Sequence, residues 1–79
     1  MIQIKDLEHL KQLADGGLDC HIRLNFGMRS SKNIHYLKDT NEFVIMNFID
    51  DSEQICKPKQ LYTLSNIGEA LDKGALWTD

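Results

Sequence analysis

The chain has 79 residues, of which 42% are hydrophobic and 27% are charged, and its formal net charge at pH 7 is −3. This composition is typical of a globular protein and excludes intrinsic disorder, so it predicts one small domain over residues 1–79. No apolar run approaches the roughly 20 residues that a membrane-spanning helix needs, and the acidic balance is not that of a chain saturated with basic residues for nucleic acid.

An amphipathic helix of about three turns is predicted at the start of the chain. Apolar residues recur there at helical spacing, at Ile4, Leu7, Leu10 and Leu13–Ala14, with polar residues between them. The two glycines at 16–17 should end this helix, because glycine readily adopts the left-handed conformation found at helix C-termini.

Three or four strands are predicted to follow as an antiparallel meander. Residues 19–26, "DCHIRLNF", alternate between apolar and polar side chains, which indicates a half-buried strand. Residues 33–37 predict a second strand, residues 42–49 an interior strand because they are apolar on both faces, and residues 54–57 a short edge strand. The sheet should end at Pro58, which has no N–H to donate and which can begin a helical turn.

A short C-terminal helix is predicted over residues 65–74, "SNIGEALDKG". Asn66 would cap its N-terminus with Glu69 as the reciprocal partner, and Gly74 would close it. Gly68 should weaken this helix by ~1 kcal/mol relative to alanine. The residues that follow the helix should pack back onto the body of the domain.

Together these elements predict an α+β fold. The N-terminal helix packs on a three- to four-stranded antiparallel meander, and short C-terminal helices close the domain. The simplest two-layer arrangement lays the helix over the sheet face that carries Ile22, Leu24 and Ile34. The opposite face would present polar side chains to solvent, with His21 and His35 as cross-strand neighbours.

The stretch "GMRSSK", residues 27–32, lies between two predicted strands and carries one glycine, two hydroxyls and two cations. It is not a Walker loop, which needs a glycine directly before the lysine, a Ser or Thr directly after it, and a helix beyond. We interpret the stretch as a hairpin turn whose backbone is set by Gly27. Its hydroxyls and cations could also hold an acidic or phosphate group through charge-assisted hydrogen bonds.

No catalytic, cofactor or metal site is predicted. Cys20 and His21 are neighbours on a strand and point to opposite faces, so they cannot share one metal ion, and no C-x-x-C or H-x-x-x-H spacing occurs. No histidine is placed as a base for a serine or cysteine nucleophile. We expect a cytoplasmic protein that is not an enzyme, with Cys20 and Cys56 reduced, and the sequence leaves open whether these two cysteines meet in space.

Charge is segregated along the chain. Residues 39–53 contain five acids and no base, whereas residues 21–38 contain no acid and four bases, Arg23, Arg29, Lys32 and Lys38. This segregation could give the molecule a positive and a negative edge. An alternative function is therefore weak nucleic-acid binding by the basic hairpin around residues 23–38. Strand parity places Phe26 and Tyr36 on the apolar face, which leaves no aromatic platform for bases and disfavours this alternative.

Three segments, "IRLNFGMRSSKNIHY", "NFIDDSEQ" and "LYTLSNIGEALDKGAL", together cover about residues 22–76. They resemble a family of small proteins of phages and integrated mobile elements in bacteria. In that family the loop usually reads "NGGLRSSK", whereas Phe26 stands here in place of the first glycine. The resemblance carries no activity, cofactor or catalytic residue. It implies an accessory protein that binds a host or element-encoded macromolecule.

We therefore predict a small non-enzymatic protein-binding module that acts on a host or element protein, without involvement of a membrane. Its partner would dock on the polar sheet face or on the "GMRSSK" stretch. The candidate partner-binding residues are His21, Arg23, Asn25, Met28, Arg29, Ser30, Ser31, Lys32 and His35.

Overall fold

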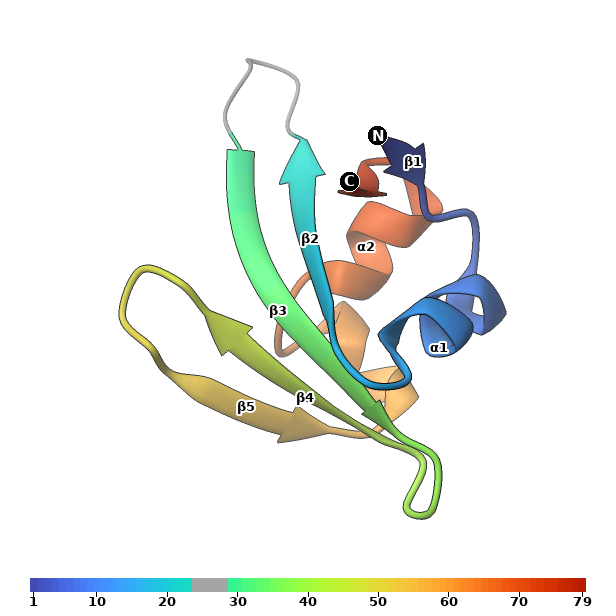
Figure 1. Cartoon of the computed structure of the whole chain (residues 1–79), viewed down its shortest axis with the longest axis vertical. Helices are drawn as coiled ribbons and strands as arrows, with labels where there is room; N and C mark the ends of the chain where they lie inside the picture. Colours follow the sequence, from blue (N-terminus) through green and yellow to red (C-terminus); the bar gives the residue numbers. More distant parts are fainter. Residues whose placement is uncertain (24–28) are drawn as a thin grey trace.

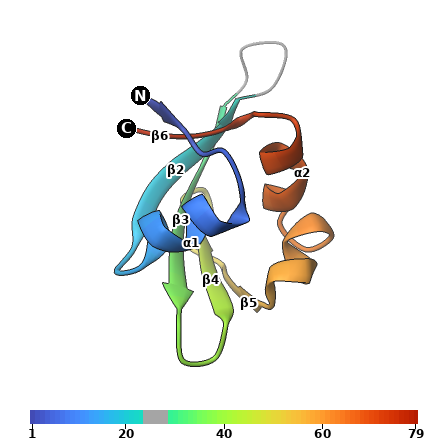
Figure 2. The ribbon, with the colours of Figure 1, turned by 90° about the vertical axis from the view of Figure 1, so that its right-hand side faces the viewer.

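The computed structural model describes residues 1–23 and 29–79, with the backbone alone for Arg29. Six strands form one antiparallel sheet in the order β1-β6-β2-β3-β4-β5. Figure 1 shows β2 to β5 side by side, and Figure 2 shows β6 at the C-terminal end of the chain. Along the chain the elements are β1 (Ile2–Gln3), α1 (Leu7–Ala14), β2 (Leu18–Arg23), β3 (Arg29–Leu37), β4 (Glu42–Asn47), β5 (Glu53–Cys56), the 3-10 helix η1 (Pro58–Tyr62), α2 (Ile67–Asp72) and β6 (Leu76–Thr78).

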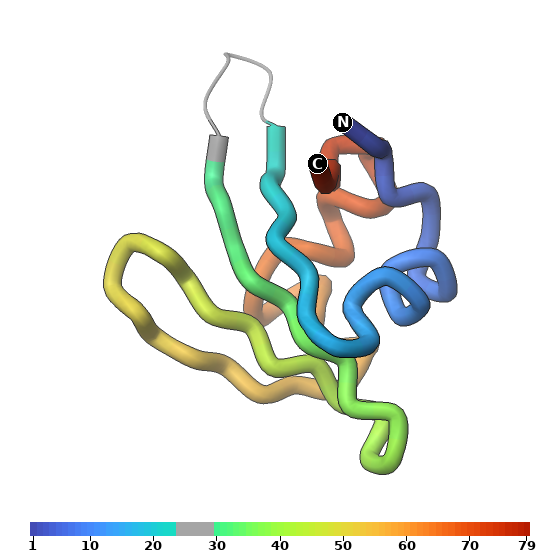
Figure 3. The backbone as a smooth tube through the Cα atoms, in the orientation of Figure 1, coloured from blue at the N-terminus to red at the C-terminus, as the bar shows by residue number. Residues whose placement is uncertain are grey.

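The predicted α+β class is confirmed, but the sheet has six strands instead of three or four. The two additional strands come from the chain ends, which lie side by side (Figure 3). Strand β6 inserts between β1 and β2, so Trp77 lies opposite Gln3 on one side and His21 on the other. Strands of two and three residues are too short for an alternating pattern, and only their long-range pairing defines them.

Helix α1 is shorter than predicted, because it begins at Leu7 and not at Ile4. The Asp6 side chain caps it by accepting a hydrogen bond from the N–H of His9 at 2.8 Å. Ile4 lies instead beside β6 and donates its own N–H to the Leu76 carbonyl at 2.9 Å. Beyond the helix, both glycines at 16–17 have positive φ, as expected.

Strand β3 begins at Arg29, four residues earlier than the predicted strand. Ser30, Ser31 and Lys32 therefore lie within the β2–β3 ladder, opposite Ile22, His21 and Cys20 in that order. The interpretation of residues 29–32 as part of a hairpin turn is wrong, because they continue the ladder with β2. Residues 24–28, which include Leu24, Asn25 and Gly27, lie outside the described residues.

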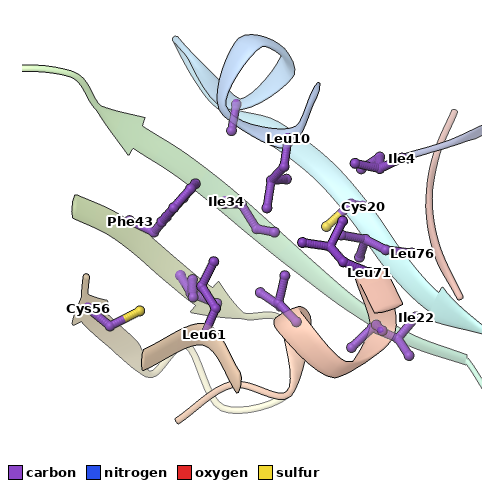
Figure 4. Packing of buried hydrophobic residues seen from close by; sticks show 14 residues of the cluster. Ile4, Leu10, Cys20, Ile22, Ile34, Phe43, Cys56, Leu61, Leu71 and Leu76 are labelled. Carbon is purple, nitrogen blue, oxygen red and sulfur yellow. The ribbon is translucent and has the colours of Figure 1, made fainter. Parts of the chain in front are cut away.

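The three helical segments lie against one face of the sheet (Figure 2). We call this the covered face, and Figure 4 shows the side chains that gather between it and the helical segments, including Leu10 of α1, Ile34 of β3, Leu61 of η1 and Leu71 of α2. The predicted placement of Ile22 and Ile34 on one buried face is confirmed. The buried apolar core consists of Ile4, Leu10, Ala14, Cys20, Ile22, Ile34, Phe43, Ile45, Cys56, Leu61, Ile67, Ala70, Leu71 and Leu76.

The C-terminal helix differs from its prediction at its first residue. Asn66 occupies the N-cap position, but it has a left-handed backbone with φ 61° and its side chain makes no capping hydrogen bond. The reciprocal cap with Glu69 is therefore wrong, and Glu69 accepts instead from the Lys73 ammonium at 2.7 Å. Pro58 begins η1 and Gly74 has a φ of 67° after α2, as predicted.

Gly68 is present for a packing reason. A Cβ atom at this position would lie 2.5 Å from the nearest atoms of the Tyr62 ring, which include the Cγ that joins the ring to its own backbone. Movement at the far end of the ring cannot relieve this overlap, so the whole side chain would have to shift. The low helix propensity of glycine is thus tolerated in α2, because it lets η1 approach closely.

We expect Gly68→Ala to destabilise the protein by about 1–3 kcal/mol, although alanine is the better helix former. In a Tyr62→Ala background the same change should be neutral or stabilising, since the overlapping ring is gone. Urea unfolding of the four proteins in this double-mutant cycle measures the effect of Gly68→Ala on stability with and without the Tyr62 ring. A stabilising Gly68→Ala in the otherwise unchanged protein would contradict the packing argument.

Candidate functional site

The nine predicted partner-binding residues do not form one surface. By the strand register, four of them lie on the sheet face that no described helix covers, which we call the open face: His21, Arg23, Ser31 and His35. Ser30 and Lys32 lie on the covered face. The backbone of Arg29 lies opposite Arg23 in the ladder, and Asn25 and Met28 are outside the described residues.

The open face as a whole is mixed in character. It carries Asp19, His21 and Arg23 of β2, Ser31, Asn33, His35 and Leu37 of β3, Glu42, Val44 and Met46 of β4, Glu53 and Ile55 of β5, and Trp77 of β6. Polar residues predominate on β2 and β3, and apolar residues are concentrated on β4 and β5. The predicted polar patch is therefore one half of a larger surface.

His21 lies between Ser31 on β3 and Trp77 on β6. It is only 5% exposed, and its Nε2 atom has no hydrogen-bond partner among the described residues. Next to it, the Arg23 guanidinium lies 5.8 Å from the centroid of the Trp77 ring, within cation–π range. The expected pairing of His21 with His35 is wrong, because the cross-strand neighbour of His21 on β3 is Ser31.

An apolar strip runs along the other half of the open face and onto the β4–β5 turn. We define it as Val44, Met46, Phe48, Ile49 and Ile55. Val44 and Ile55 are direct cross-strand partners, which brings their side chains together. Ile49 is 87% exposed, Ile55 61% and Phe48 48%. Exposed apolar side chains clustered in this way are typical of interaction surfaces.

The turn that carries Phe48 and Ile49 is closed by its own polar groups. The side-chain oxygen of Asn47 accepts a hydrogen bond from the N–H of Ile49 at 3.1 Å, and the backbone carbonyl of Asn47 accepts one from the N–H of Asp51 at 3.0 Å. Asp50 accepts the Ser52 N–H at 3.0 Å and the Ser52 hydroxyl at 2.6 Å. Asp51 has a left-handed backbone with φ 56°. The polar side chains thus stabilise the turn, and the apolar ones point to solvent.

Sequence reasoning missed the apolar strip because it assigned residues 42–49 to one interior strand. Strand β4 ends at Asn47, and the two apolar residues after it lie in the turn. The signal was present in "NFIDDS", where asparagine, two aspartates and serine can bond to neighbouring backbone groups. The apolar run "FVIM" before it outweighed that signal.

A cleft opens on the covered face, between strands β2 and β3 on one side and helix α2 with Ser65 and Asn66 on the other. Two cavities of about 240 Å³ and 190 Å³ share Lys32, Ser65 and Asn66 in their walls. The larger one continues over Ile22, Ala70 and Ala75. The smaller one continues toward β4 and β5, where its walls include Asn47 and Gln54. Lys32, predicted as part of a turn, is therefore a cleft residue.

Within residues 1–23 and 29–79, no group of three or more His, Cys, Asp or Glu residues is close enough to hold a metal ion. No helix in this part of the chain is long and apolar enough to cross a membrane. Comparisons with protein-family models, with curated proteins and with solved structures found no match. The arguments for function therefore come from the surfaces themselves.

The two cysteines do not meet. Cys20 lies on β2 and Cys56 on β5, with β3 and β4 between them. Three strand spacings amount to roughly 14 Å, which is about twice the longest Cα separation that a disulfide spans. Burial raises the pKa of Cys20 to about 12, and burial likewise raises the pKa of Cys56. Both thiols are protonated at neutral pH and therefore poor nucleophiles.

The raised pKa of Cys20 makes stability depend on pH in the alkaline range. Above the pKa of an unfolded thiol, near 9.0, the unfolded chain loses this proton while the folded protein keeps it up to about pH 12. The free energy of unfolding should therefore fall as the pH rises from 9 toward 12. Urea unfolding at several pH values should show a shallower fall for Cys20→Ala than for the unchanged protein, and equal slopes would contradict this assignment.

Proposed function

We propose that this protein is a small non-enzymatic protein-binding module whose partner docks on the open face and is anchored by the apolar strip. The observation that carries the proposal is the β4–β5 turn, which holds Ile49 87% exposed on a hydrogen-bonded backbone. An exposed isoleucine side chain makes no stabilising contact with water. Its burial by a partner would contribute about 25 cal/mol of binding free energy per Å² of apolar surface.

The internal hydrogen bonds of the turn favour binding for a second reason. Asn47 and Asp50 hold the backbone on both sides of Ile49 in one conformation before any partner arrives. A preorganised anchor loses less conformational entropy on binding than a free loop does. The polar half of the open face, around Arg23 and His35, would form the hydrated rim of such an interface.

Strand β5 adds backbone groups to the same surface. Asn47 donates its N–H to the Ser52 carbonyl at 3.0 Å, which identifies that pair as a hydrogen-bonded one. Pairs alternate in an antiparallel ladder, so the N–H and C=O of Glu53 and Ile55 point away from β4. No described strand pairs with this edge. An extended segment of the partner could add there as a further strand, next to Ile55.

The resemblance to small phage and mobile-element proteins supports a host or element-encoded protein as the partner. Such a partner needs no catalytic group on this chain, and an apolar anchor flanked by an edge strand is sufficient to recognise it.

The proposal predicts which exposed isoleucines matter for partner capture. The protein should retain a partner from a lysate of its source cell, and Ile49→Thr combined with Ile55→Thr should weaken the affinity for the captured protein at least about tenfold. Ile2→Thr is the matched control, because Ile2 is also exposed and in a strand but lies at the opposite edge of the sheet. Each change should alter the free energy of unfolding by less than about 0.5 kcal/mol.

Titration of the purified variants with the captured protein measures the affinities. Equal affinity for the double variant and for Ile2→Thr would contradict a docking site at the apolar strip.

Nucleic-acid binding is a second candidate, because Trp77 lies on the open face beside Arg23 and could stack on a base. The basic residues do not support it as a group. Lys32 lies on the covered face, and Lys38 pairs with Asp15 at 2.8 Å, a contact that raises the pKa of Lys38. Acidic residues on the open face, among them Glu42 and Glu53, further weaken attraction to phosphates.

We expect single- and double-stranded oligonucleotides to bind more weakly than about 10 µM at physiological salt, because few phosphates would be neutralised. Fluorescence anisotropy at several salt concentrations measures this. Sub-micromolar binding that weakens steeply with salt and is lost in Arg23→Gln would favour the nucleic-acid function over the protein-binding one.

A further inference from the structure

The cleft on the covered face has an amphipathic lining. One side is formed by the small apolar residues Ala70 and Ala75 together with Ile22. The other side carries amide and hydroxyl groups, among them Asn47, Ser52 and Gln54. Lys32, Ser65 and Asn66 line both cavities. A lining of this kind suits a small molecule that has an apolar body and a polar end.

Lys32 is a charged residue on the face of the sheet that carries the apolar core. Its strand neighbours on the covered face are Cys20 on β2 and Asn47 on β4, and the next residue of β3 on that face is the buried Ile34. Its side chain is only partly exposed, and it makes no hydrogen bond or ion pair with the described residues. A lysine ammonium that lines a cleft and has no ion-pair partner is available to bind an anion there.

Glu69, which lines the larger cavity, and Asp50, in the turn beside the smaller one, already accept hydrogen bonds. Glu69 accepts from the Lys73 ammonium at 2.7 Å, and this contact lowers the pKa of Glu69. Asp50 accepts from the hydroxyl and the N–H of Ser52, which lower the pKa of Asp50. Glu69 is thus paired with Lys73, and Asp50 is held by Ser52 with a smaller electrostatic contribution from Lys32. Lys32 itself makes no hydrogen bond and no ion pair within the part of the chain that the structure describes.

Asn66 supplies a second donor beside Lys32. Its left-handed backbone takes it out of the capping role that its position before α2 suggests, and its side-chain amide makes no hydrogen bond among the described residues. Lysine rather than arginine at the centre of the cleft offers a compact charge, which suits a tetrahedral or a planar oxyanion equally well.

We propose that this cleft binds a small organic anion, with its phosphate or carboxylate group at Lys32 and Asn66 and its apolar part against Ile22, Ala70 and Ala75. Phosphate and carboxylate share the chemistry that the cleft recognises, namely oxygens that accept from an ammonium and an amide. Lys32 lies on the covered face, whereas Val44, Met46 and Ile55 of the apolar strip lie on the open face, and the two sites approach each other only at the β4–β5 turn.

Phenyl phosphate, benzoate and inorganic phosphate serve as probes, with binding followed by NMR shift changes of the full chain. Phenyl phosphate or benzoate should bind with a Kd below about 10 mM and change the NMR chemical shifts of Lys32, Asn66 and Ala70. Inorganic phosphate should bind roughly tenfold more weakly than phenyl phosphate, because it lacks a ring to cover the apolar wall. Preference for phenyl phosphate or for benzoate identifies which anion the cleft takes.

Two variants and one control test the assignment of the donors. Lys32→Gln removes the charge, and Asn66→Gly removes the amide while keeping the left-handed backbone accessible. Each should weaken binding at least about tenfold, whereas Lys59→Gln, an exposed residue outside both cavities, should leave it unchanged. Circular dichroism verifies that the variants are folded.

Absence of binding by both organic probes, or equal weakening by Lys59→Gln, would overturn the proposal. Binding that persists in both Lys32→Gln and Asn66→Gly would overturn it as well, since the anion would then lie elsewhere.

Discussion

The pairing of β2 with β3 determines what each surface of this protein can do. Cys20 lies opposite Lys32, and His21 lies opposite Ser31. Because side chains alternate along a strand, this register sends Cys20 and Lys32 toward the helices and His21 and Ser31 toward the open face. A shift by one residue would exchange the two sets, burying His21's polar neighbours and exposing the core. Both the cleft and the open face therefore depend on this one ladder.

The described helical segments are too short to cover both faces of the sheet. The three helical segments have eight, five and six residues, and together they cover only part of one face of a six-stranded sheet. The core lies between the covered face and the helical segments, the cleft around Lys32 lies between that face and α2, and no described helix covers the opposite face. An apolar strip on that open face would be costly in a protein without a partner, which is why its composition supports binding.

Local patterns predicted the parts of the fold that local physics controls. Alternation placed Cys20 and Ile22 in the core, Pro58 ended the sheet, and Gly74 followed the last helix with positive φ. Long-range pairing controls the rest. Strand β6 exists because Leu76–Thr78 fits between β1 and β2, and Arg29 extends β3 because β2 offers a partner. No pattern within those segments indicates either pairing.

The same difference between local sequence pattern and long-range strand pairing applies to the candidate sites. Hydroxyls and cations in "GMRSSK" predict polar chemistry, but which face each one reaches depends on where the strand begins, so Lys32 and Ser31 lie on opposite sides of the sheet. Asn66 was predicted to cap α2 from its type and position, yet a left-handed backbone directs its amide elsewhere. Residue type thus predicts the available chemistry, and the register decides which groups can act together.

Asn47 is the point where the two proposed surfaces meet. Its side-chain oxygen holds the N–H of Ile49 in the exposed turn, and the same residue lies opposite Lys32 and lines the smaller cavity. A substitution of Asn47 would disturb both surfaces at once, so its effect could not be assigned to protein binding or to anion binding. Ile49 and Ile55 line neither cavity, and Lys32 and Asn66 are not part of the apolar strip. Those two pairs are therefore the positions at which protein binding and anion binding can be separated.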